Sequence, residues 1–240
     1  MKINKKTIQI IILILIILII GGYFFNEFYL KKHQNINQDQ EINLNSLFEF
    51  KNYNEKLSDQ EFENYSKRVL DAKEIILNNP QALNPSHWLM IARMKKYVND
   101  FKGAEQIYFF LIQKDENNYL VYGNLADLCS DYLFNYEKAA EYYRKAIEKS
   151  ETNPNMQFLY YKNLVGIYSS NLENDRNDFE NKILKIYENK YKNSFDFLTM
   201  LASYYKNINN KNNAIKYLEQ ALKLDPQNQI IKDEIEWLRK

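Results

Sequence analysis

Residues 195–228 carry small and large side chains at spacings that allow one pair of helices to pack on the next. The residues that fix this spacing are Ala202, Tyr205, Ala214, Leu218, Ala221 and Pro226. Small side chains permit two helix axes to approach closely, while larger ones fill the grooves beside them. Pro226 ends the second helix, because proline cannot continue it. The segment therefore predicts a helical hairpin that needs neighbouring copies to bury its apolar faces.

The same spacing recurs upstream of this segment. Ala92 and Ala126 lie 34 residues apart, whereas Ala104 and Ala139 lie 35 residues apart. The difference predicts one additional residue in the turn near residues 131–134. A fixed period that recurs over about 140 residues favours an array of stacked hairpins over an antiparallel bundle without repeats.

The 34-residue period and the six positions in residues 195–228 resemble the tetratricopeptide repeat. The resemblance implies an all-α fold, a right-handed superhelix of the α-α solenoid type. The repeats that it implies span residues 85–118, 119–154, 158–191 and 195–228. The third of these is degenerate, because Lys182 stands where the second helix usually has a small residue.

A further helix is predicted at each end of the array. Residues 59–80 are interpreted as a half-repeat helix that closes the N-terminal end, so the repeat domain covers residues 59–240. Residues 229–240 are interpreted as a capping helix with one polar face, which a helical array needs to stay soluble. The apolar face of this helix is predicted to contain Ile231, Ile235 and Leu238, widened by Ile230 and Trp237. Glu234 falls inside that apolar arc.

Residues 8–29 are predominantly apolar and predict a single transmembrane helix. It follows a short tail over residues 1–7 and precedes a polar linker over residues 30–58. As a helix, its most apolar part, Ile8 to Phe25, would span about 27 Å of the roughly 30 Å hydrocarbon core. The lysines before the stretch favour a cytoplasmic N-terminus. Because abundant Asn, Lys and Ile suggest a bacterial genome, we expect a single-pass protein of a bacterial cytoplasmic membrane, with extracytoplasmic repeats.

Two alternatives to this topology stay open. A cleaved signal peptide has a poor cleavage site here, because Gly22 at position −1 places Ile20 at position −3. The repeats could also lie in a cytosol behind an N-terminal anchor, as in organelle import receptors.

The sequence has no pattern typical of catalysis, so we expect a protein that is not an enzyme. Its five glycines form no phosphate-binding loop, and His33 and His87 lack partners at metal-ligand spacing. Cys129, the only cysteine, is interpreted as a small core residue. We therefore predict no cofactor and no metal. The chain has 32 basic and 31 acidic residues, and this balance argues against nucleic acid as a partner.

The resemblance also implies a binding groove, lined by the first helix of each repeat, for a protein or peptide segment. The positions that it assigns to the groove are Arg93, Lys96, Tyr97, Asn124, Asp127, Lys162, Asn163, Ser203 and Lys206. One subgroup of the family binds C-terminal carboxylates with a set of Lys, Asn and Arg side chains. Leu89 and Arg93 depart from that set, so no carboxylate clamp is predicted.

Together these features favour a membrane-anchored scaffold for protein–protein interaction, acting in the assembly or chaperoning of an envelope complex. The alternative is a non-catalytic accessory subunit of an envelope enzyme, for example in glycan or peptidoglycan assembly.

Overall fold

Every regular element in residues 44–79 and 84–240, the ranges that the computed structural model describes, is helical. The predicted tail, the transmembrane anchor and residues 30–43 of the predicted linker lie outside the described residues. Across the two described ranges, no helix combines the length and the apolar character needed to cross a membrane.

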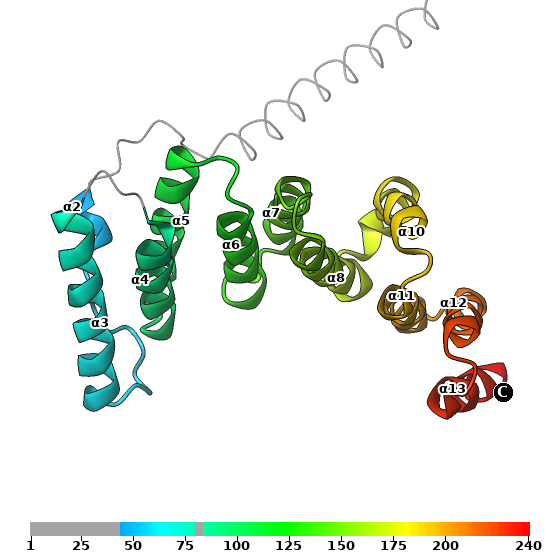
Figure 1. Cartoon of the computed structure of the whole chain (residues 1–240). Helices are drawn as coiled ribbons and strands as arrows, with labels where there is room; N and C mark the ends of the chain where they lie inside the picture. The colour runs from blue at the N-terminus through cyan, green and yellow to red at the C-terminus, as the bar shows by residue number, and fades with distance from the viewer. Residues whose placement is uncertain (1–43, 80–83) are drawn as a thin grey trace, which may run out of the picture. The chain divides into compact units, whose positions relative to one another are not determined.

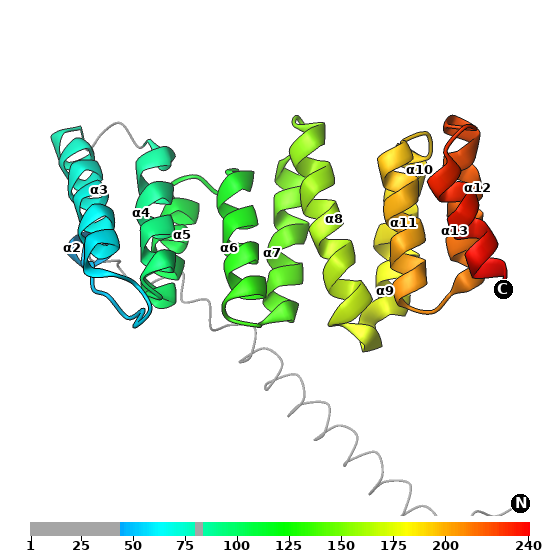
Figure 2. The same cartoon turned by 90° about the horizontal axis from the view of Figure 1, so that it is seen from below.

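The helices follow one another side by side in chain order, and Figures 1 and 2 show this row from two directions. The helices before the third repeat are α2 (Leu44–Leu47), α3 (Asp59–Asn78), α4 (Pro85–Tyr97), α5 (Phe101–Lys114), α6 (Tyr119–Asp131) and α7 (Tyr136–Lys149). The third repeat begins with α8 (Pro154–Ser170), four residues before the predicted boundary. The last helices are α11 (Phe195–Asn207), α12 (Lys211–Leu224) and α13 (Gln229–Arg239).

Polar residues before the helices explain where many of them begin. The side chains of Asn84, Asp100, Asn135, Asn153, Ser194, Asn210 and Asn228 each accept a hydrogen bond from a backbone N–H of the first helical turn. Such caps satisfy N–H groups that have no partner within the helix. Many of the asparagines thus mark the hairpin boundaries.

The turns inside the hairpins account for the spacing of the alanines. Three residues, 98–100 and 208–210, separate the helices of the first and fourth repeats, whereas four residues, 132–135, separate α6 from α7. The additional residue predicted near residues 131–134 is therefore present in this turn. Each turn contains one residue with positive φ, namely Asn99, Phe134 or Asn209.

The second helix of the third repeat is irregular. It consists of a 3-10 turn (Glu173–Asp175), α9 (Arg176–Phe179), a π-helical turn (Glu180–Leu184) and α10 (Lys185–Tyr191). The π-helical turn contains Lys182, where the other repeats have the fully buried Ala104, Ala139 and Ala214. A π-helical turn adds a residue to the helical path and displaces the side chains that follow. The degenerate repeat predicted from the sequence is thus irregular at the residue that replaces the alanine.

Residues 44–57, which we call the strap, differ from the polar linker predicted for residues 30–58. Leu47 is fully buried, and the ring of Phe48 stacks on that of Trp88 with centroids 5.0 Å apart. The backbone N–H of Tyr53 donates to the carbonyl oxygen of Val98 at 2.9 Å. The short apolar sequence around Leu47 and Phe48 therefore packs on the first hairpin, although the segment as a whole is polar.

The capping helix α13 also differs in part from its prediction. Ile231, Ile235 and Leu238 are buried, but Ile230 and Trp237 are 79% and 63% exposed. The expectation that these two residues widen the buried face is wrong. Helix α13 packs mainly on α12, and this contact covers only the narrow stripe of Ile231, Ile235 and Leu238.

Candidate protein-binding face

The nine predicted groove residues lie on four first helices, α4, α6, α8 and α11. We call the side of these helices that carries them the first-helix face. All nine are accessible to solvent, either exposed or partly buried. Arg93, Asp127 and Ser203 are each the ninth residue of their helix, which explains why they share one side of the row.

Tyr143 connects two of the predicted residues across three helices. Its hydroxyl donates to Oδ1 of Asp127 at 2.6 Å, and Nδ2 of Asn163 donates to the same hydroxyl oxygen at 3.3 Å. Tyr143 lies on α7, while Asp127 and Asn163 lie on α6 and α8. The network holds both side chains in fixed orientations on a partly exposed surface.

Lys96 and Arg93 of α4 lie close enough to this network to interact with it electrostatically. Burial lowers the pKa of Lys96, Arg93 adds to this effect, and the carboxylates of Asp127 and Asp131 oppose it. Burial raises the pKa of Asp127, while the hydrogen bond from Tyr143 and the charge of Lys96 oppose that shift. We call Arg93, Lys96, Asp127, Tyr143 and Asn163 the Asp127 cluster. It provides cationic and anionic groups beside an oriented amide.

Three other predicted residues have contacts outside the Asp127 cluster. Nδ2 of Asn124 donates to the carbonyl oxygen of Leu120 in its own helix at 2.7 Å. The ring of Tyr97 lies 5.2 Å from that of Tyr65 on α3, so it packs toward the N-terminal end. Lys206 forms an ion pair with Glu234 of α13, which explains why a charge is tolerated in the arc predicted to be apolar.

Lys162 and Ser203 are exposed on the first-helix face, away from these contacts. Tyr143 and Gly166 are absent from the sequence-based set. Tyr143 occupies a position of the second helix that normally packs against its neighbours, so the sequence does not indicate that its hydroxyl forms hydrogen bonds. Gly166 is the ninth residue counted from the predicted repeat start at residue 158, equivalent to Asp127 and Ser203, and this register could have identified it.

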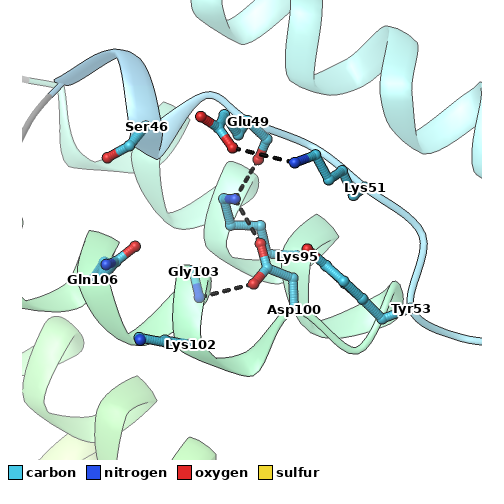
Figure 3. Close-up of a pocket in the computed structure, with 9 residues that line it drawn as sticks. All are labelled: Ser46, Glu49, Lys51, Tyr53, Lys95, Asp100, Lys102, Gly103 and Gln106. Atoms are coloured by element: carbon cyan, nitrogen blue, oxygen red, sulfur yellow. Dashed lines mark hydrogen bonds and ion pairs between the residues drawn. The ribbon is translucent and has the colours of Figure 1, made fainter.

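A separate pocket of about 140 Å³ lies beneath the strap (Figure 3). Nζ of Lys95, which is 1% exposed, donates to Oδ2 of Asp100 at 2.7 Å and to the backbone carbonyl oxygen of Glu49. Oδ1 of Asp100 accepts from the N–H of Gly103 at 2.9 Å. These groups hold the strap on the first hairpin, so the pocket has a structural explanation. Within the described ranges, no group of three or more His, Cys, Asp or Glu side chains could hold a metal ion.

A row of helical hairpins with accessible first helices defines the class of α-helical repeat proteins. A family model described as tetratricopeptide repeat matches residues 119–153 and 195–228, which contain α6–α7 and α11–α12. These two segments are therefore similar to tetratricopeptide repeats, and the resemblance inferred from the sequence is confirmed for the second and fourth repeats. Repeats of this family are protein-interaction scaffolds that are generally not catalytic. No curated protein matches the chain.

Proposed function

We propose that the chain is a membrane-anchored scaffold whose first-helix face binds a segment of another protein. The observation that carries this proposal is the Asp127 cluster. Lys96, Asp127 and Asn163 come from three successive first helices, and they stay accessible to solvent while Tyr143 links two of them. A surface whose polar groups are already oriented loses little conformational entropy when a partner binds.

The chemistry of the cluster suits the backbone and polar side chains of an extended segment. Because Asn163 uses Nδ2 toward Tyr143, its Oδ1 is oriented to accept a hydrogen bond from a peptide N–H. Arg93 is exposed at the edge of the cluster and provides a cation for a carboxylate or carbonyl oxygen of the partner.

The location is proposed from the sequence. The apolar residues 8–29 would anchor the chain in a bacterial cytoplasmic membrane, with the lysines before them in the cytoplasm and the repeats outside. In that place the scaffold would assist the assembly or chaperoning of an envelope complex. Proteolysis of intact cells, then of cells with a permeabilised outer layer, tests this: repeats that resist digestion in both would contradict an extracytoplasmic location.

Photo-crosslinking in native membranes tests the binding function. The full chain carries a photoreactive amino acid at Lys162, on the first-helix face, or at the matched control Lys223, an exposed lysine on α12. We expect a discrete protein adduct from position 162 only, and its yield should fall in Asp127→Ala and Tyr143→Phe. Equal adducts from both positions, or none from position 162, would contradict the proposal.

A further inference from the structure

The exposed apolar side chains of α13 continue the first-helix face at its C-terminal end. Trp237 is the ninth residue of α13, as Ser203 is of α11 and Asp127 of α6. Ile230 is the second residue of α13, as Leu120 is of α6. The ion pair between Lys206 and Glu234 joins α11 and α13 on this same side. Helix α13 therefore presents Trp237 where α4, α6 and α11 present predicted groove residues, and Ile230 lies seven positions before Trp237 on the same side of the helix.

We propose, on the basis of the protein-binding function above, that Ile230 and Trp237 bind an uncharged segment of the partner protein that carries a large apolar side chain. The two residues are seven positions apart, so they share one side of the helix. They are 79% and 63% exposed, although α13 is already held by Ile231, Ile235 and Leu238. Covering a tryptophan removes a large apolar area from water, and tryptophan is enriched among the residues that dominate binding energy.

The charges around Ile230 and Trp237 indicate that the segment is uncharged. Glu234 is paired with Lys206, and Arg239 donates to Glu219 at 2.7 Å. Oδ1 of Asp233 accepts from Nε2 of Gln229 at 2.7 Å. The remaining charges on α13 and at its C-terminal end have both signs, Asp233 and Glu236 together with Lys232 and Lys240, so they favour neither an acidic nor a basic segment. The Asp127 cluster, by contrast, provides polar groups for the other end of the same partner.

Small residues lie on the first-helix face between the Asp127 cluster and Trp237. Between Asp127 and Trp237 along the row lie Gly166, the ninth residue from the predicted repeat start at residue 158, and Ser203, the ninth residue of α11. A Cβ atom added at Gly166 would meet nothing within 4 Å, whereas one at Gly123 would lie 2.2 Å from the ring of Tyr160. Glycine inside a helix costs roughly 0.5–1 kcal/mol relative to alanine. Because internal packing does not explain Gly166, we assign it to the close passage of the partner segment.

A second copy of the chain fits this surface less well. A two-fold axis that places Trp237 on Ile230 of another copy would also bring the two Asp233 side chains together, and like charges at an interface oppose association. A lipid surface also fits less well. Asp233 and Glu236 are exposed beside the apolar residues and offset the charges of Lys232 and Lys240, while anionic lipids attract segments with a basic excess.

The test uses the purified full-length chain and a peptide selected on it from a library of random linear dodecamers. The chain has two tryptophans, Trp88 and Trp237, and Trp88 is 2% exposed. Binding should shift the tryptophan emission to shorter wavelength, because Trp237 leaves water. Labelled-peptide anisotropy gives the affinity of the original chain, Trp237→Ala, Ile230→Ala, Asn163→Ala and Leu70→Ala. Leu70 is the matched control, since it is 62% exposed on α3 at the other end.

We expect Trp237→Ala to weaken binding at least about tenfold and to abolish the shift, with Leu70→Ala unchanged. Peptides whose binding depends on Asn163 but not on Trp237 would overturn this inference and leave the proposed function standing. Failure to select any peptide that binds the first-helix face would overturn both. Self-association or vesicle binding that requires Trp237, measured by sedimentation, would also overturn the inference, because the occupant would then be a second copy or a lipid surface.

Discussion

The two ends of the row of described helices differ in how far other segments cover them. At the N-terminal end the strap covers the first hairpin through the stack of Phe48 on Trp88 and the buried contacts of Lys95. At the C-terminal end α13 has no such cover, and Trp237 and Ile230 stay exposed. Both ends have an aromatic residue and a lysine–carboxylate pair. The aromatic ring and the lysine are buried at the first end and accessible at the second.

This difference separates residues that hold the fold from residues that are available to a partner. A terminal helix of a repeat array must leave one side uncovered, and polar residues normally occupy that side. Here the strap covers one end, although α3 also leaves Leu70, Ile75 and Leu77 exposed, while α13 keeps Ile230 and Trp237 in water and no strap among the described residues covers it. We infer that stability is concentrated at the N-terminal end and that the C-terminal end can change without loss of the fold.

The largest expected effect follows from Lys95→Ala. This change leaves the Asp100 carboxylate and the Glu49 carbonyl oxygen without their buried cation, and removal of one partner of a buried ion pair costs about 3–5 kcal/mol. Urea unfolding of the full chain measures the loss. The matched control is Lys206→Ala, whose pair with Glu234 is accessible and should contribute at most about 1 kcal/mol. Equal losses in the two variants would contradict the difference between the ends.

A somewhat smaller effect is expected from Phe48→Ala. The phenylalanine is 8% exposed, and truncation of a buried aromatic side chain costs about 3 kcal/mol. The strap should detach before the hairpins unfold, so hydrogen exchange at the N–H of Tyr53, which binds Val98, is the most direct measurement. Unchanged protection of this N–H would show that the stack on Trp88 does not hold the strap.

The sequence predicts the repeats well because their signals are local. The fully buried Ala104, Ala139 and Ala214 recur at the repeat length, and the additional residue before α7 follows from their spacing alone. Capping residues are also local, since each contacts an N–H within three positions.

The strap and the exposed face of α13 depend on contacts that spacing does not reveal. Phe48 and Lys95 meet partners about forty residues away in sequence, and the polar composition around Phe48 conceals its burial. For Trp237, the sequence periodicity predicts an apolar side of α13, but it does not predict how much of that side other helices cover. Tyr143 was missed for a related reason, because its ring follows the repeat pattern while its hydroxyl joins Asp127 to Asn163.

The two glycines Gly103 and Gly166 should respond to alanine with opposite signs. A Cβ at Gly103 would lie 2.2 Å from Oδ2 of Asp100, so Gly103→Ala displaces the cap that Lys95 also binds and should cost about 1–3 kcal/mol. Gly166→Ala meets no atom within 4 Å and should stabilise the chain by roughly 0.5–1 kcal/mol. Urea midpoints at constant slope measure both changes. A loss of stability in Gly166→Ala would mean that the glycine has an internal structural role.

The smallest expected effect is that of Trp237→Ala on the chain without a partner. The side chain is 63% exposed, and exposed positions away from special features usually change stability by no more than about 0.5 kcal/mol. Truncation of its counterpart at the other end, Phe48→Ala, should lower the free energy of unfolding several times more, although both residues are aromatic and lie near a terminal helix. Urea unfolding of the two variants, side by side without added peptide, makes the comparison direct. If Trp237→Ala destabilised the chain as much as Phe48→Ala, the tryptophan would be part of the core of α13, and its exposure could no longer be interpreted as a binding property.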